Sequence, residues 1–63
     1  MIRHSFEIIF ENVQTNKCIK EEFDSFGKTF IHAWKEVNEY ALKKLESFNK
    51  YVVLKNIEYT NMR

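Results

Sequence analysis

Residues 5 to 12 alternate between apolar and polar positions with a period of two, which is the pattern of a half-buried β-strand. The two sides of this predicted strand carry Phe6, Ile8 and Phe10, and Glu7, Ile9 and Glu11. A second segment with strand character runs from Lys17 to Phe23, after the four residues 13–16. Asn16 suits the end of a turn, because asparagine tolerates the left-handed conformation better than most residues. The pattern predicts a β-hairpin.

A loop over 13–16 places Asn12 opposite Lys17 and so fixes the register of the hairpin. The cross-strand pairs that follow are Phe10 with Ile19, Ile8 with Glu21, and Phe6 with Phe23. A shift by one residue would set Phe10 against Lys20, so the apolar pattern favours the first register. Glu21 is the one misfit, and we expect its carboxylate to bend to solvent at the sheet edge.

Residues 28 to 48 show the 3.6-residue period of an amphipathic helix. A narrow apolar stripe on the helical wheel holds Phe30, Trp34, Val37, Ala41, Leu45 and Phe48. The flanking positions are Ala33 and Tyr40 on one side, and Ile31 and Leu42 on the other. The opposite face carries Lys28, His32, Lys35, Glu39, Lys43 and Glu46. We expect Ser25 or Thr29 to cap the start of the helix and Asn49 to end it.

Residues 51 to 59 are rich in β-forming side chains but alternate imperfectly. One phase groups Val53, Ile57 and Tyr59, whereas the other groups Val52 and Leu54. Either a β-bulge near residues 55–56 switches the phase, or both faces of this third strand are partly covered.

The order strand, strand, helix, strand predicts an α+β fold. Because the helix returns the chain, the third strand pairs antiparallel with the first. The result is a ββαβ unit, a three-stranded antiparallel sheet in order 2-1-3 with the long helix packed on one face. The other face is bare, and the apolar residues that we expect on it are Ile9, Cys18, Val52 and Leu54. We interpret them as a candidate partner surface, although scattered apolar residues on a surface need no special role.

Composition narrows the class of protein. The 63 residues predict one domain, 1–63, and the single cysteine excludes an internal disulfide and zinc-finger spacing. Ten basic and nine acidic residues give no marked basic excess, and no apolar run is long enough to span a membrane. The N-terminal residues lack the pattern of a signal peptide, so we expect a cytoplasmic protein without a membrane partner. The bias towards Lys, Asn, Ile and Phe is typical of AT-rich bacterial or phage genomes, which suits an accessory protein of a mobile element.

The residues that could carry chemistry lack partners on their own faces. His4 and His32 are expected in different layers, each solvated, and Cys18 is expected opposite Glu11 and therefore inert. Glu21 and Glu22 are adjacent and point to opposite faces of a strand, so they form no chelate. One glycine cannot build a phosphate loop. We therefore predict no catalytic, cofactor or metal site, and no small-molecule substrate.

Two main hypotheses of function remain, beside a third, that the chain is an enzyme subunit that completes an active site only in a complex. The first is a non-enzymatic protein-interaction domain that acts through the uncovered sheet face, an edge strand or a homodimer. The second is nucleic-acid binding through lysines near the C-terminal end of the helix and on the third strand. These lysines are Lys43, Lys44, Lys50 and Lys55. The helix dipole explains part of their clustering, and glutamates interrupt the rest of the helix surface.

Overall fold

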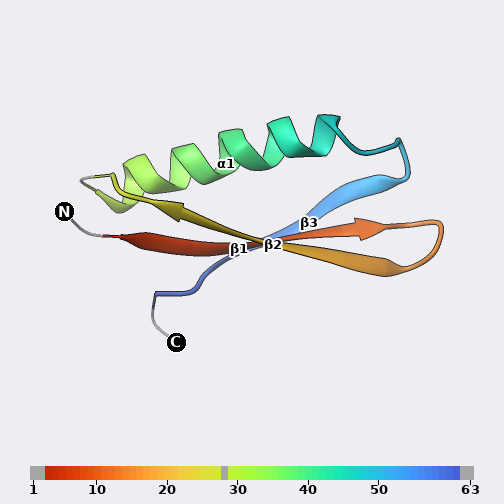
Figure 1. Cartoon of the computed structure of the whole chain (residues 1–63), viewed down its shortest axis with the longest axis horizontal. Coiled ribbons are helices and arrows are strands. Elements are labelled where there is room, and N and C mark those ends of the chain that lie inside the picture. Colours follow the sequence, from red (N-terminus) through yellow and green to blue (C-terminus); the bar gives the residue numbers. More distant parts are fainter. Residues whose placement is uncertain (1–2, 28, 62–63) are drawn as a thin grey trace.

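The computed structural model describes residues 3–27 and 29–61 of the chain. A sheet of three strands lies under one helix (Figure 1). The elements in chain order are β1 (His4–Asn12), β2 (Lys17–Ser25), α1 (Phe30–Glu46) and β3 (Val52–Tyr59). All three strands are antiparallel and their order is β2-β1-β3, which confirms the predicted ββαβ topology.

The hairpin has the register that the apolar alternation predicts. Asn12 pairs with Lys17, and the pairing continues without a shift to His4 and Ser25 at the other end. Asn16 adopts a φ of 61°, as expected of the residue that closes this loop. The side-chain oxygen Oδ1 of Asn12 accepts hydrogen bonds from two backbone amides inside the loop. Local turn chemistry and cross-strand pairing therefore specify the same register.

A β-bulge sets the phase of β3. Its pairing with β1 shifts between Ile9 and Phe10, so that Ile9 pairs with Asn56 and Phe10 pairs with Leu54. Lys55 is the extra residue, which confirms the bulge predicted near 55–56. The bulge turns the apolar residues on both sides of Lys55, except Val53, towards the helix. These helix-facing residues are Val52, Leu54, Ile57 and Tyr59.

The placement of Val52 and Leu54 on the bare face was therefore wrong. Val52 is only 7% exposed and belongs to the core, and Leu54 packs against that core. The predicted grouping of Val53 with Ile57 and Tyr59 was also wrong, because Val53 pairs with Glu11 on the bare face and is exposed. The sequence pattern left the bulge as one of two alternatives, and only the pairing with β1 selects it.

The helix is rotated about its axis relative to the predicted stripe. Its buried residues are Ala33, Val37 and Ala41, which pack on the helix-facing side chains of β1. Phe30 and Trp34, which the pattern placed in the middle of the stripe, are more than 40% exposed. Small residues let the helix approach the sheet closely, so the larger aromatic side chains lie at one margin of the contact. This rotation leaves apolar surface uncovered on one flank of α1.

Both ends of α1 are capped by local hydrogen bonds. The Thr29 hydroxyl accepts the backbone N–H of His32, which selects Thr29 over Ser25 as the N-cap. The expected start at Lys28 lies outside the described residues. Ser47 forms the C-cap, so the helix ends earlier than the predicted residue 48. Asn49 then shapes the turn into β3, because its Oδ1 accepts the N–H of Tyr51.

Candidate interaction surfaces

The side of α1 that faces β2 is closed by polar contacts. The Tyr40 hydroxyl donates a hydrogen bond of 2.9 Å to Glu21 Oε1, and Lys44 Nζ lies 3.6 Å from the same oxygen. The expected bend of Glu21 into solvent was wrong, since its carboxylate points to the helix and its Oε2 is buried. The hydrogen bond to Glu21, with desolvation and the nearby negative charge, raises the pKa of Tyr40. The polar misfit of the hairpin thus joins β2 to the helix.

A second polar contact fixes the connection between β2 and α1. Ser25, which is buried at the end of β2, donates a hydrogen bond of 3.1 Å to Glu36 Oε1. The Ser25 hydroxyl also accepts the backbone N–H of Gly27. His32 Nε2 lies 2.9 Å from the same Glu36 oxygen, so the helix start is tied to the strand. On this flank Phe26 and Ile19 are exposed apolar side chains, but they lie apart from each other, at the end of β2 and near its start.

The bare face of the sheet is strongly charged, as the alternation that places Glu7, Glu11, Lys20 and Glu22 on it predicts. Ile9 and Cys18 lie there as predicted, and Val53 takes the place assigned to Val52 and Leu54. The register sets three glutamates side by side across the sheet, with Glu7 between Glu22 and Glu58. An apolar partner on this face would have to take these three carboxylates out of water, which is costly. The predicted partner surface is reduced to three scattered side chains.

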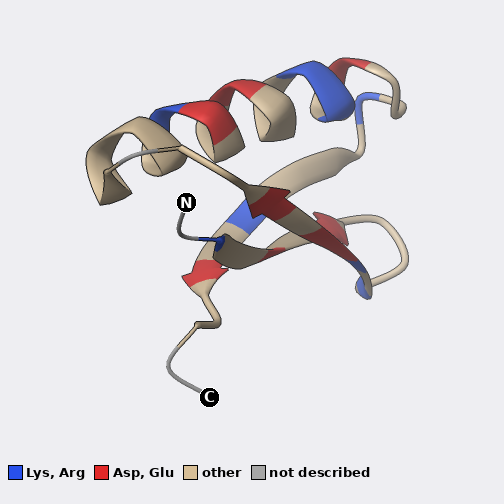
Figure 2. Ribbon diagram, turned by 60° about the vertical axis from the view of Figure 1, so that its left-hand side comes forward, with Lys and Arg blue, Asp and Glu red and all other residues tan. Residues whose placement is uncertain are grey.

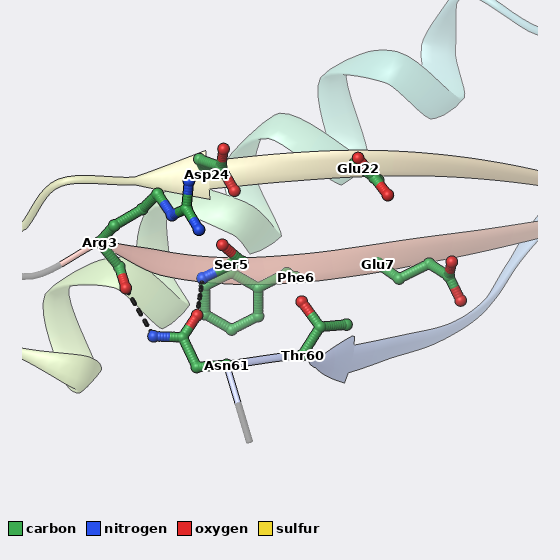
Figure 3. A pocket seen from close by; sticks show the side chains of 8 residues that line it. All are labelled: Arg3, Ser5, Phe6, Glu7, Glu22, Asp24, Thr60 and Asn61. Atoms are coloured by element: carbon green, nitrogen blue, oxygen red, sulfur yellow. Dashed lines mark hydrogen bonds between the residues drawn. The ribbon is translucent and has the colours of Figure 1, made fainter. Parts of the chain in front are cut away.

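The end of the bare face where β1 begins contains a shallow polar recess of about 490 Å³. Its lining residues, drawn in Figure 3, are Arg3, Ser5, Phe6, Glu7, Glu22, Asp24, Thr60 and Asn61. Asn61 ties the chain after β3 to the start of β1, because its Oδ1 accepts the Ser5 N–H and its Nδ2 donates to the Arg3 carbonyl (Figure 3). Three carboxylates and one guanidinium make the recess acidic, which does not suit a phosphate or another anion.

Cys18 is exposed on the bare face and lies opposite Glu11, as predicted. The sequence pattern did not predict a cation beside it. Lys55 Nζ lies 4.0 Å from Cys18 Sγ and 3.8 Å from Glu11 Oε2, because the bulge brings Lys55 onto this face. The three groups form an exposed charged contact between all three strands.

The two histidines lie in different layers, and one of them differs from the prediction. His4 is only 7% exposed, so its placement as a solvated residue was wrong. It shares the helix side of β1 with Phe6, forms a hydrogen bond of 2.9 Å from Nδ1 to the Tyr59 hydroxyl, and packs edge-on against Phe30. His32 remains a largely exposed residue of the helix, beside Glu36. The two histidines therefore lie in separate places, and neither lies beside Cys18.

Large exposed apolar side chains gather on the flank of α1 that faces β3. We call this surface the apolar flank; its residues are the exposed Phe30, Ile31, Trp34 and Leu42, together with Leu45, which is partly buried against the core. The ring of Phe30 packs edge-on against Tyr59 of β3, with centroids 4.9 Å apart, which places this side of the helix above β3. Successive helix residues are 100° apart, so Ile31 and Leu42 extend the surface from Trp34 away from the sheet.

The exposure of the apolar flank is high for such large side chains. Ile31 is 70% exposed, Leu42 57% and Trp34 41%. The helical wheel had placed Ile31 and Leu42 beside the core stripe, but it could not show that the helix turns them away from the sheet. The signal in the sequence was the apolar residues that flank the narrow stripe, because stripe and flanking positions together are wider than the sheet contact can cover. The structure therefore moves the main apolar surface from the sheet to the helix.

The four lysines of the nucleic-acid hypothesis do not form one surface. Lys44 points towards the sheet and pairs with Glu21 on the helix side, whereas Lys55 pairs with Glu11 on the bare face. Lys50 lies over the ring of Tyr51, and Lys43 is an exposed helix residue. Figure 2 shows basic segments separated by acidic ones along the helix, and further basic positions in the following loop and on β3. The predicted cluster is thus divided between the two faces of the sheet.

Residues 3–27 and 29–61 contain no group of three or more His, Cys, Asp or Glu side chains that could hold a metal ion. Within the same residues, no helix has the length and apolar character needed to cross a membrane. Comparison of the chain with protein-family models, curated proteins and solved structures gives no match in any of the three. Inference about function therefore depends on the geometry of the chain itself.

Proposed function

We propose that this chain is a small, non-enzymatic protein-interaction domain that binds its partner through the apolar flank of α1 and the adjacent edge of β3. The observation that carries the proposal is the exposure of Ile31, Trp34 and Leu42 on one continuous side of the helix. Contiguous apolar surface of this kind is typical of protein-binding sites, whereas single exposed apolar residues are ordinary. The location expected from the sequence is the cytoplasm.

The free edge of β3 also favours a binding surface on this side of the molecule. Each outer strand has one edge without a neighbour, and an unpaired edge can accept another strand. Residues 17–24 of β2 include five charged side chains, which discourage pairing at that edge. The eight residues of β3 include only Lys55 and Glu58 as charged residues, and Phe30 of the apolar flank packs on Tyr59 of this strand. The bulge at Lys55 interrupts the edge, so an added strand would pair with the regular stretches on either side of it. A partner on this side can contact both elements at once.

The bare sheet face supports the proposal less well. Binding there would take the carboxylates of Glu7, Glu22 and Glu58 out of water, and only three scattered apolar side chains on that face would gain from burial. The separation of the histidines from each other and from Cys18 is the reason for proposing a non-enzymatic role.

Paired variants test this function. The variant Ile31→Glu/Leu42→Glu places two charges on the apolar flank, at positions whose side chains are mostly in solvent. A matched control, Val13→Glu/Gln14→Glu, adds the same charges to the exposed hairpin loop. The full chain would be used as bait in its native host, after circular dichroism has shown that both variants fold.

We expect a specific partner to be retained by the wild type and the loop control and to be lost with the flank variant. The proposal is refuted if the flank variant retains every partner that the wild type binds. It is refuted equally if the wild type neither self-associates nor recovers a specific partner.

Nucleic-acid binding through Lys43, Lys44, Lys50 and Lys55 remains the alternative proposal. The ion pairs of Lys44 and Lys55 with glutamates on opposite faces give it less support than a continuous basic surface would. It predicts an affinity for mixed oligonucleotides that falls steeply with salt. A titration at low salt without binding would exclude it.

A further inference from the structure

We propose that the partner of the apolar flank is a second copy of this chain, related by a two-fold axis beside β3. This inference rests on the proposed function and names its partner. An isologous dimer requires a surface that is complementary to itself when one copy is turned by 180°. The described residues of α1 and β3 meet this requirement in spacing, reach and charge.

Four of the five side chains of the apolar flank are spaced symmetrically about the middle of α1, whereas the fifth, Phe30, has Glu46 at the symmetric position. The midpoint of Phe30–Glu46 is Asn38. Trp34 and Leu42 lie four residues on either side of it, and Ile31 and Leu45 lie seven residues on either side. In an antiparallel pair centred on Asn38, Trp34 therefore faces Leu42 of the second copy and Ile31 faces Leu45 of the second copy. Each contact occurs twice.

The reach of these side chains suits a dimer that joins the two β3 edges. Since α1 contacts all three strands, its axis lies above the central strand β1. Strands in a continuous sheet are about 4.8 Å apart, so three spacings place the two helix axes roughly 14 Å apart. Ordinary helix pairs pack at about 8–10 Å. Only long side chains can fill the wider gap between the helices. Trp34 of one copy and Leu42 of the other are long enough to do so.

Charges at the margin of the contact are also self-complementary. Lys35 and Glu39 lie on the solvent side of the apolar flank. With the axis at Asn38, Lys35 of one copy and Glu39 of the other are offset by two residues, or about 3 Å, along the helix direction, and they attract one another across the space between the two helices without a direct ion pair. On β3 the midpoint falls between Lys55 and Asn56. The same axis sets Lys55 diagonally across from Glu58 of the second copy, within reach of an attractive cross-strand contact.

The area available is sufficient for a dimer of modest affinity. A helix of 17 residues is about 25 Å long, and a flank about 10 Å wide covers roughly 250 Å². The eight-residue edge of β3 is about 26 Å long and adds a strip of similar size beneath it. The total is roughly 1,000 Å² over both copies, at the lower end of specific interfaces. Neither element alone reaches this size, so we infer that both take part.

Analytical ultracentrifugation of the full chain tests the inference, from roughly 5 µM to roughly 500 µM, where an interface of this size associates. We expect the mass to rise from one copy to two as concentration increases. Ile31→Glu/Leu42→Glu should stay monomeric, while the loop control Val13→Glu/Gln14→Glu should behave as the wild type.

Charge reversal supplies an independent readout that loss of folding cannot imitate. Lys35→Glu alone and Glu39→Lys alone each create two repulsive contacts, and we expect each to weaken dimerisation about tenfold. The combined variant restores opposite charges across the axis, so its dissociation constant should return to within about threefold of the wild type. In the dimer, hydrogen exchange should slow at amides of β3 more than at amides of β2.

A wild-type mass of one copy at every concentration overturns the inference. A dimer that persists unchanged in the flank variant also overturns it and assigns the contact to another surface. Failure of the combined charge reversal to restore association refutes the antiparallel register. The proposed function does not depend on the dimer. It holds after any of these results if a different protein binds the wild type and the loop control but not the flank variant. Failure of the dimer and failure of the proposed function are therefore distinguishable.

Discussion

Ile8 and Ile9 are neighbours of the same type that lie on opposite faces of β1, and they provide a direct test of which face is covered. Ile8 is fully buried between the sheet and α1, whereas Ile9 is half-buried on the bare face. Separate Ile8→Ala and Ile9→Ala variants remove the same atoms from the same strand. The loss of β-propensity is similar in both, so it largely cancels when the two variants are compared.

The expected magnitudes follow from burial. Replacing isoleucine by alanine removes three carbons, worth about 2.4 kcal/mol when all of them are buried. At Ile8 an unfilled cavity of about 50 Å³ adds roughly 1.2 kcal/mol, giving a loss of about 3.5 kcal/mol. At Ile9 about half of the transfer term applies and no cavity forms, so the loss is about 1 kcal/mol. A chain of 63 residues is expected to have a free energy of unfolding of about 3–9 kcal/mol.

Urea unfolding, followed by circular dichroism at a concentration where the protein is monomeric, measures both losses. With a slope of about 1 kcal/mol per M for so small a domain, the midpoint of Ile8→Ala should lie at least about 2 M below that of Ile9→Ala. Where Ile8→Ala leaves too little folded protein, Ile8→Val and Ile9→Val give the same comparison on a smaller scale. Equal midpoint shifts for the two positions would refute the assignment of a covered and a bare face.

Three further predictions test the polar contact, the turn and the bulge. Tyr40 holds its proton more tightly in the folded protein because its hydroxyl donates to Glu21, so the hydrogen bond stabilises the fold fully below the ordinary tyrosine pKa of 10.0. The stabilisation is lost as pH rises through the raised pKa of the folded state. Urea midpoints measured against pH should show the advantage of the wild type over Tyr40→Phe shrinking above pH 10.0. Asn16→Ala should lower the free energy of unfolding by about 1 kcal/mol, while Asn16→Gly should lower it little or not at all, as thermal unfolding would show. Val52→Thr should lower the free energy of unfolding by at least about 1 kcal/mol because it buries a hydroxyl, whereas Val53→Thr should leave it nearly unchanged. Equal losses in urea unfolding would contradict the bulge.

The sequence by itself determined the hairpin. The alternation of Phe6, Ile8 and Phe10 distinguishes the two faces of β1, and a shift of one residue would exchange them. Asn16 supplies a local conformation that closes the loop in the same register. Both signals act over a few residues, so they can be read without knowing what the rest of the chain does. The existence of the helix and the strand order followed from similar short-range patterns and from chain connectivity.

Tertiary packing decided the rotation of α1. The helical wheel identifies a wide apolar sector but not the line within it that approaches the sheet. Ala33, Val37 and Ala41 form that line because small side chains permit close contact, and the hydrogen bond of Tyr40 to Glu21 fixes the side facing β2. The sector is wider than the contact, so the remaining apolar side chains form the flank above β3.

The bulge in β3 and the burial of His4 also required the tertiary structure. The apolar residues before and after Lys55 gain from burial, but only pairing with β1 shows that this extra residue lets Val52 and Leu54 reach the core together with Ile57 and Tyr59. His4 was read as a surface residue because it is polar and near the chain start, yet Phe30 and Tyr59 enclose it. Short-range patterns thus determine which elements form, while the faces that they cover depend on contacts between residues far apart in the chain.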